Sequence, residues 1–283
     1  MHVNFSGLRP TNMLPGTETA LLSTDIKAAA PGMHLSDLHA DLKSWAAAAP
    51  TAGEATVRAS ASHVISDAFQ CRGESLDLSG RGLTSLPDSL GGLTQLKQLN
   101  VSDNPLQAFP TKALLTLTSL QTLQLGMNKQ NDGVPFRRSH ERFADEGYKL
   151  QFFAQGNNRA QIMQQPPRQK TALFTTDLAP CLAAMIVQDG KSIALHMDNP
   201  KRSGSGGLPL EDAFARHLLR SAQDTQVFLV GANDQGSAGN VRAMLSTLDK
   251  HGLANNISMA SLGNGHTSAT LDVNNRQAWV GFG

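Results

Sequence analysis

Chemistry-bearing residues gather in the stretch FTTDLAPCLAAMIVQDGKSIALHMD, residues 174–198. It contains Cys181, one of two cysteines in the chain, and His196 fifteen residues later. A thiol with the ordinary pKa of about 8.5 is mostly protonated at neutral pH, and a neighbouring imidazole can take that proton and return it to a leaving group. The pair predicts a cysteine nucleophile that attacks a carbonyl carbon, with release of ammonia if the substrate is a carboxamide.

A Cys–His pair of this kind needs a group that orients the ring and donors that stabilise an oxyanion. Thr175, Thr176 and Asp177, or a backbone carbonyl, are candidates for the orienting group. Backbone N–H groups around Cys181 are candidates for the oxyanion site. The alternative is a buried thiol that only packs, which is the more frequent role of a cysteine among apolar residues.

The elements that must position this pair are two apolar runs, CLAAMIV and SIALHM, on either side of Asp189-Gly190. An Asp-Gly pair between apolar runs is a hairpin signal, so the two runs are predicted to pair antiparallel. A hairpin that returns on itself brings Cys181 and His196 to within a few ångströms of each other. Further strands are predicted at TALFTT, TQVFLVG, NISMASL, ATLDV and QAWVGF, with helices at 210–222 and 237–251.

An internal repeat precedes this region. Leu76, Leu99 and Leu123 recur at intervals of 23 and 24 residues, each within a short strand-like motif, and Asn104 stands where it can satisfy backbone groups inside a turn. The pattern resembles the bacterial class of leucine-rich repeats over about residues 58–128, and its leucines are expected in the core. The polar strand positions expected to face a partner are Asp77, Asn100 and Gln124.

Fewer than three full repeat units bury little apolar surface, so the array is expected to pack against a neighbouring part of the chain. Helices are predicted at 36–46, with Ser36 as N-cap, and at 58–70, the first ended by Pro50 and Gly53. Together they predict a helical cap on the repeats. Cys71 follows the second helix and is expected to be a core thiol.

The sequence therefore divides into four predicted parts, and the fold class is mixed α/β. Residues 1–35 are a disordered leader, 36–128 the helical cap and repeats, 129–168 a linker with a packing helix near 139–150, and 169–283 a second folded domain. The leader is rich in small and hydroxyl residues with few charges, which resembles the leaders of bacterial type III effectors.

Charge and hydropathy exclude several classes of function. A net charge of +1 and 17% charged residues provide no basic surface for nucleic acid. No apolar run reaches the roughly 18 residues that span a bilayer, so no membrane span is expected. Two cysteines far apart in the sequence do not indicate a disulfide framework and fit a reducing compartment.

The spacing of Thr175, Cys181 and His196, with an apolar strand after the cysteine, resembles the CheD-like glutamine deamidases, whose catalytic core is shared by cytotoxic necrotizing factor. The resemblance covers about residues 170–281 and implies an α/β/β sandwich. It implies that Cys181 is the nucleophile, that His196 is the general base and acid, and that Thr175 positions the histidine. No metal or organic cofactor is implied.

Ala179 and Pro180 depart from the Gly and Ser that the family has before its cysteine, which predicts a different turn there. The expected function is that of a secreted effector in the host cytoplasm, which deamidates a glutamine of a host protein and contacts proteins through its repeats. The residues expected to bind the substrate are Asp177, Asp198 and Asn199. Alternatives are a transglutaminase or cysteine protease with the same pair, or an inactive repeat-based binding protein, which Pro180 would favour.

Overall fold

The computed structural model describes residues 32–128, 138–153, 160–164, 169–188, 190–198, 210, 217–218 and 223–282. The chain divides into two units between Gly32 and Met33. Apart from Gly32, the first unit lies outside the described residues, and so does the predicted leader up to residue 31. All of the described helices and strands belong to the second unit, residues 33–283.

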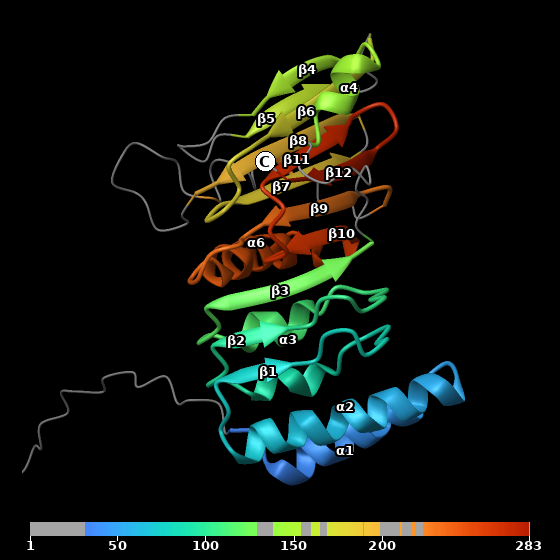
Figure 1. The fold of residues 1–283 in the computed structure, drawn as a ribbon, viewed down its shortest axis with the longest axis vertical. Coiled ribbons are helices and arrows are strands. Elements are labelled where there is room, and N and C mark those ends of the chain that lie inside the picture. The colour runs from blue at the N-terminus through green and yellow to red at the C-terminus, as the bar shows by residue number, and fades with distance from the viewer. Residues whose placement is uncertain are drawn as a thin grey trace, which may run out of the picture. The chain divides into compact units, whose positions relative to one another are not determined.

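The first half of this unit places short strands beside one another and helical turns behind them (Figure 1). The three strands are parallel, and Leu76, Leu99 and Leu123 are register partners across them, as the spacing predicts. The elements are α1 (Leu35–Ala47), α2 (Ala52–Gln70), β1 (Ser75–Asp77), η1 (Asp88–Gly92), β2 (Gln98–Asn100), α3 (Thr111–Thr116) and β3 (Thr122–Met127). Helices α1 and α2 pack together, and α2 lies next to β1.

Asn104 has the structural role predicted from its place in the repeat. Its Oδ1 accepts from the backbone N–H groups of Arg81 and Leu83, and its Nδ2 donates to the carbonyls of Leu78 and Val101 at 2.8 and 3.0 Å. A single buried amide therefore satisfies backbone groups from two successive turns, which would otherwise be buried without partners.

The second half contributes most of the strands. The seven strands predicted between residues 171 and 282 match β6–β12 to within one residue at each end. The elements are α4 (Glu141–Asp145), β4 (Lys149–Phe152), β5 (Gln161–Gln164), β6 (Thr171–Thr175), β7 (Leu182–Gln188), β8 (Lys191–Met197), β9 (Gln226–Gly231), α6 (Ala238–Lys250), η3 (Ala254–Asn256), β10 (Ile257–Leu262), β11 (Ser268–Asp272) and β12 (Gln277–Gly281).

One sheet runs through both halves. Its eight strands follow the order β1-β2-β3-β10-β9-β7-β8-β5, and the join is the antiparallel pair β3–β10, in which Gly126 faces Ser261. Strand β3, in the region where repeats are predicted, therefore pairs with a strand more than a hundred residues later, so this region packs against another part of the chain. A second sheet of four strands follows the order β12-β11-β6-β4. The fold is therefore mixed α/β with two sheets.

Strand β7 shows how the layers pack. Alternate residues of a strand point to opposite faces. Leu182, Ala184 and Ile186 share a core with α6, whereas Ala183 and Met185 share a core with β6, β11 and β12. Helix α6 thus covers one face of this part of the large sheet, and the four-stranded sheet covers the other.

Helix starts differ from the predictions. The residue that precedes α1 is His34, so Ser36 lies inside the helix and is not its N-cap. Helix α2 begins at Ala52, six residues before the predicted start, because Thr51 accepts a hydrogen bond from the N–H of Glu54 and caps it. Cys71, at the C-cap of α2, is exposed, so the prediction of a core thiol is wrong.

The predicted linker is not a mere connection. The helix expected near 139–150 is only the five residues of α4, and the chain from Lys149 is strand β4. Strands β4 and β5 each add an edge to one sheet, parallel to β6 and antiparallel to β8, respectively. Pairing of β4 with β6 therefore replaces the end of the predicted helix. The helix predicted at 210–222 falls largely outside the described residues.

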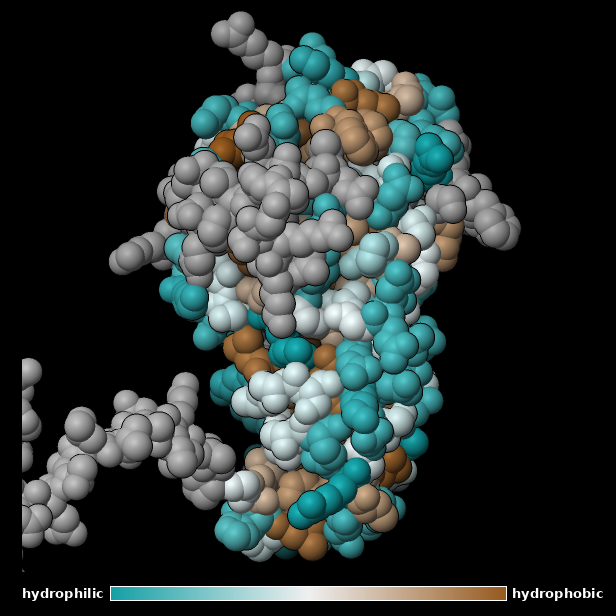
Figure 2. Space-filling view, turned by 90° about the vertical axis from the view of Figure 1, so that its left-hand side faces the viewer, coloured by the Kyte–Doolittle hydropathy of each residue, from teal (hydrophilic) through white to brown (hydrophobic). Residues whose placement is uncertain are grey.

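Within the described residues, no helix has both the length and the apolar character needed to cross a bilayer. Figure 2 shows that the visible face outside the grey atoms is mostly hydrophilic or neutral, with apolar residues in scattered spots. That face therefore shows no single broad apolar surface for a partner.

Candidate functional site

The candidate site lies between the two sheets. The predicted hairpin is confirmed: β7 and β8 pair antiparallel, and Ala183 stands opposite His196. Cys181 comes just before β7 and packs in the core between the sheets, with Ala183 and Ala194. The two-residue period of a strand puts His196 on the same face of β8 as Ala194. Both Cys181 and His196 are 1% exposed.

Thr175 reaches this site from the other sheet. It is the last residue of β6 and is fully buried. Its Oγ1 lies 2.6 Å from Nδ1 of His196. This contact joins the sheets and fixes the ring, so that Nε2 is the nitrogen that remains to serve Cys181. Of the orienting candidates in the sequence, Thr175 is the one that contacts His196.

Asp198 completes the group. The Cys181 thiol donates to its Oδ1 at a sulfur–oxygen distance of 3.4 Å, and Nε2 of His196 lies 3.8 Å from the same oxygen. The strand register explains this placement, because Leu182 pairs with Met197 and the next residues outward are Cys181 and Asp198. The Asp198 side chain is 30% exposed, so it lies between the buried pair and solvent.

Burial lowers the pKa of His196 below its ordinary value of 6.5, and the negative charges of Asp198 and Asp177 oppose that shift without reversing it. The ring is therefore neutral at physiological pH, which is the state that can accept a thiol proton. Its Nε2 is buried and has no hydrogen-bond partner. A buried ring nitrogen in that condition is a candidate for a proton, a substrate group or a metal.

The loop before Cys181 is held by its backbone carbonyls. The carbonyl of Ala179 accepts from the N–H groups of Asn233 and Asp234 at 2.7 and 3.1 Å, and that of Cys181 accepts from the N–H of Ala232 at 2.7 Å. The carbonyl of Pro180 accepts from a side-chain amide. Pro180 lacks an N–H, yet the conformation around it is fixed by these bonds from the turn after β9.

Two residues that the sequence reasoning missed hold this loop against the rest of the site. Asn240 in the first turn of α6 donates to the carbonyls of both Pro180 and Asp198, at 3.2 and 3.0 Å. Gly231 has a φ of +111°, and a Cβ there would lie 2.4 Å from the Cys181 carbonyl oxygen. The Gly-rich turn in QVFLVGANDQG was the available signal for Gly231. Nothing comparable in the sequence marked Asn240.

The remaining predicted residues lie around the group. Asp177 is exposed, has a φ of +61°, and accepts a hydrogen bond from Thr176 at 2.9 Å. Thr176 therefore faces Asp177 rather than the imidazole. Asn199 lies outside the described residues. Asp177, Asp198 and Pro180 form the exposed or half-exposed surface next to the buried pair.

The turn that holds the cysteine loop is itself held by residues just before β3. The carbonyl of Gln121, just before β3, accepts from the N–H groups of Gly236 and Ala238 at 2.9 and 3.2 Å. Arg242 of α6 donates to the carbonyls of Leu117 and Leu120 at 3.0 and 2.9 Å. Residues 117–121 therefore support the segment that positions Cys181.

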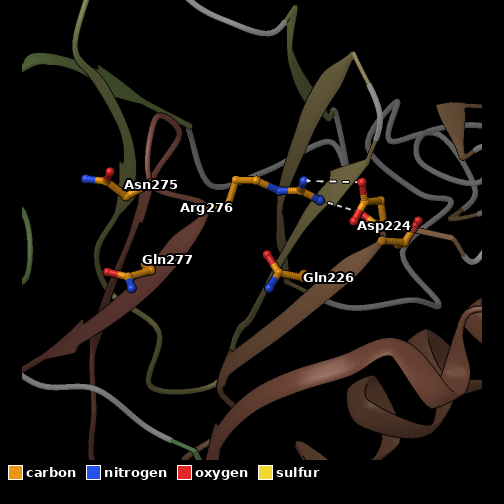
Figure 3. Close-up of a pocket in the computed structure, with 6 residues that line it drawn as sticks. Asp224, Gln226, Asn275, Arg276 and Gln277 are labelled. Atoms are coloured by element: carbon orange, nitrogen blue, oxygen red, sulfur yellow. Dashed lines mark hydrogen bonds and ion pairs between the residues drawn. The ribbon is translucent and has the colours of Figure 1, made fainter.

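A cavity of about 410 Å³ lies elsewhere, where β9 and β12 begin (Figure 3). Figure 3 shows the Arg276 side chain extending toward Asp224, to which it is joined by a hydrogen bond and an ion pair. The lining is otherwise amide and hydroxyl side chains, with neither a thiol nor an imidazole. This cavity therefore lacks a thiol–imidazole pair, so the group around Cys181 is the stronger candidate for catalysis.

A buried thiol, a neutral imidazole held by a hydroxyl and an adjacent carboxylate can carry out nucleophilic attack on a carbonyl carbon. The same three ligand types could also hold a metal ion. No protein-family model matches this chain, and no curated protein matches it.

Proposed function

We propose that this protein is a secreted bacterial effector that deamidates a glutamine side chain of a host protein through a thioester on Cys181. The observation that carries the proposal is the 2.6 Å contact between Thr175 and His196, made between two sheets beside a buried cysteine. A buried imidazole nitrogen needs a hydrogen-bond partner in any role, as Nδ1 of His266 has in Ser261, so what supports catalysis here is that the Thr175–His196 contact stands beside a buried thiol. The Cys181, His196 and Thr175 set is also the one that the CheD-like resemblance implies.

The chemistry follows from the two ring nitrogens. With Nδ1–H donating to the Thr175 hydroxyl, Nε2 of His196 takes the thiol proton and the sulfur attacks the carboxamide carbon. The imidazolium then returns its proton to the departing ammonia, leaving a thioester. Water, activated by the same Nε2, hydrolyses the thioester to a carboxylate, so glutamine becomes glutamate. Asp198 is close enough to stabilise the imidazolium.

The fold supports the same proposal at a finer level. We propose that β1–β3 and their connections are a short leucine-rich repeat array with α1 and α2 as its helical cap. The register of Leu76, Leu99 and Leu123 supports this. We propose that the layers α6, large sheet and four-stranded sheet are a CheD-like α/β/β sandwich. The domain limits at residues 35, 128 and 168 stay predictions.

Secretion and the host target rest on the composition of the leader and on the presence of the repeats. Asp77, Asn100 and Gln124 are register partners and none is buried, so their side chains are available to a protein partner. Contact with host proteins through this row is part of the proposal.

The test is a host cytosolic extract incubated with the reduced full chain, followed by ammonia measurement and peptide mass mapping. We expect conversion of glutamine to glutamate that disappears in Cys181→Ser and in His196→Gln and persists in Cys71→Ser. Cys71 is the matched control because it is exposed and lies at the end of α2. If Cys181→Ser produced the same conversion as the unmodified chain, the deamidase proposal would be wrong.

The same peptide mass maps distinguish deamidation from the alternative reactions. A transglutaminase would give cross-linked or amine-modified glutamines, and a protease would give new peptide ends. The absence of any Cys181-dependent product would favour a binding protein.

A further inference from the structure

Three potential metal ligands meet at the candidate active site. The Cys181 Sγ, a ring nitrogen of His196 and a carboxylate oxygen of Asp198 all lie within 4.8 Å of one another. Within the described part of the chain, no other three side chains of His, Cys, Asp or Glu come together in this way. We propose that Cys181, His196 and Asp198 form a zinc site that holds the nucleophile in a reversible, inactive form.

The distances suit a tetrahedral ion. Zinc bonds of about 2.0–2.3 Å at tetrahedral angles place neighbouring ligand atoms about 3.3–3.6 Å apart. The Sγ–Oδ1 distance is 3.4 Å, and the Nε2–Oδ1 distance is 3.8 Å. All three ligand atoms lie within 4.8 Å of one another, so coordination requires the side chains to move closer together around the ion.

The state of the His196 ring is an independent observation that points to a ligand. Its Nε2 is buried and has no hydrogen-bond partner, although buried polar atoms generally have one. Its Nδ1 is held by Thr175 at 2.6 Å. Histidines that bind metals characteristically use their second nitrogen for such an outer hydrogen bond, which orients the coordinating nitrogen.

The ligand set selects the metal. Thiolate, imidazole and a carboxylate favour zinc, whereas calcium and magnesium prefer sites made only of oxygen. Three protein ligands leave the fourth tetrahedral position for water. The partly exposed side chain of Asp198 gives an ion a path from solvent to the buried sulfur.

Zinc binding would make both the Cys181 sulfur and Nε2 of His196 unavailable for catalysis. The thiol proton passes to solvent, and the sulfur and Nε2 lone pairs are donated to the ion, so neither attack on a carboxamide nor proton transfer can occur. This inhibition rests on the proposed deamidase function. The metal site does not, because it follows from ligand geometry alone.

The binding test uses the reduced, chelator-treated full chain titrated with Co²⁺ as a coloured substitute for zinc. We expect one ion per chain and a thiolate-to-cobalt charge-transfer band that Zn²⁺ removes. The band should be absent in Cys181→Ser and unchanged in Cys71→Ser. Thr175→Val removes only the outer hydrogen bond and should weaken binding about 10–100-fold.

Asp198→Asn, on the partly exposed ligand, is a second variant in case replacement of buried Cys181 disturbs the fold. A band that survives in Cys181→Ser, or that is lost in Cys71→Ser instead, would overturn the site, and so would unchanged affinity in Asp198→Asn. Circular dichroism of each variant separates loss of a ligand from loss of the fold.

The activity test is kept apart from the binding test. If deamidation occurs, added Zn²⁺ should stop it and a chelator should restore it. Deamidation that continues at saturating zinc would overturn the inhibitory role. Cys181-dependent cobalt binding by a chain that never deamidates would support the metal site and count against the deamidase.

Discussion

The region of β1–β3 and the region around Cys181 are held together in different ways. In the first, the same contact recurs at a nearly constant interval, as in the register of Leu76, Leu99 and Leu123. In the second, Thr175 and Asn240 act on the same site from β6 and α6, and no spacing relates them. A repeated contact is visible in a sequence, whereas a site built from separate elements is not.

The two regions are nevertheless not independent. Strand β3 pairs with β10, and the carbonyls of Leu117, Leu120 and Gln121 receive hydrogen bonds from the turn and helix after β9. That turn holds the carbonyl of Cys181. The comparison therefore predicts that the regular region supports the irregular one.

The largest effect is expected from deleting residues 1–128. The deletion exposes the edge of β10 and the surface of α6 that packs against α3, so residues 129–283 should not fold cooperatively. Thermal unfolding followed by circular dichroism measures this directly. If the fragment unfolded cooperatively with full Cys181-dependent activity, the repeats would not be a support.

Arg242→Met tests the same dependence without removing a strand. It leaves the carbonyls of Leu117 and Leu120 without their charged donor, so the free energy of unfolding should fall by about 2 kcal/mol. Lys112→Met is the control, because its ion pair with Asp88 is exposed and should contribute about 0.5 kcal/mol or less. Urea unfolding of the two variants gives the comparison, and equal losses would contradict it.

Among substitutions that add a single methyl group, Gly231→Ala should lower the free energy of unfolding the most. Its Cβ would meet the Cys181 carbonyl in a backbone conformation that suits glycine, so we expect a loss of about 3 kcal/mol or more, with loss of activity. Gly239→Ala in α6 is the control, because a Cβ there meets nothing within 4 Å. Chemical denaturation should find Gly239→Ala as stable as the parent or more so. A harmless Gly231→Ala would show that the loop tolerates movement.

Thr175→Val tests the orientation of the ring. It keeps the shape of the side chain and removes the hydroxyl from Nδ1 of His196, so kcat should fall about 10–100-fold while KM stays the same. Thr176→Val is the neighbouring control, because its hydroxyl donates to Asp177. Steady-state kinetics on the substrate found by mass mapping would measure both. An equal fall in the two variants would remove Thr175 from its positioning role.

The smallest effect is the pH dependence of stability. Because burial lowers the pKa of His196, the unfolded chain binds a proton below about pH 6.5 that the native chain does not. Above that pH the His196 ring is neutral in both the folded and the unfolded chain. As the pH drops toward the lowered native pKa, the unfolded chain is protonated first, so the free energy of unfolding falls. Denaturant unfolding with a chelator present should show a flatter curve for His196→Gln between pH 7 and 5.5. Parallel curves would contradict the shift.

Much of the second half could be predicted from local patterns. The β7–β8 hairpin followed from Asp189-Gly190 between apolar runs, and it placed Cys181 near His196. Strands β4 and β5 were missed because each has only four residues, two of them apolar, and because their pairing depends on sheet edges formed elsewhere. Cys71 was misjudged because its exposure depends on how α2 lies against β1.

The sequence by itself determined the register of β1–β3, the positions of β6–β12 and the pairing that brings a thiol near an imidazole, because each depends on contacts of fixed period or short range. The tertiary structure alone decided that one sheet joins β1–β3 to the site and that Gly231 and Asn240 fix the cysteine loop. It also decided that Asp198 stands beside both Cys181 and His196. Those contacts join elements far apart in the chain, and their geometry exists only once the two sheets have packed.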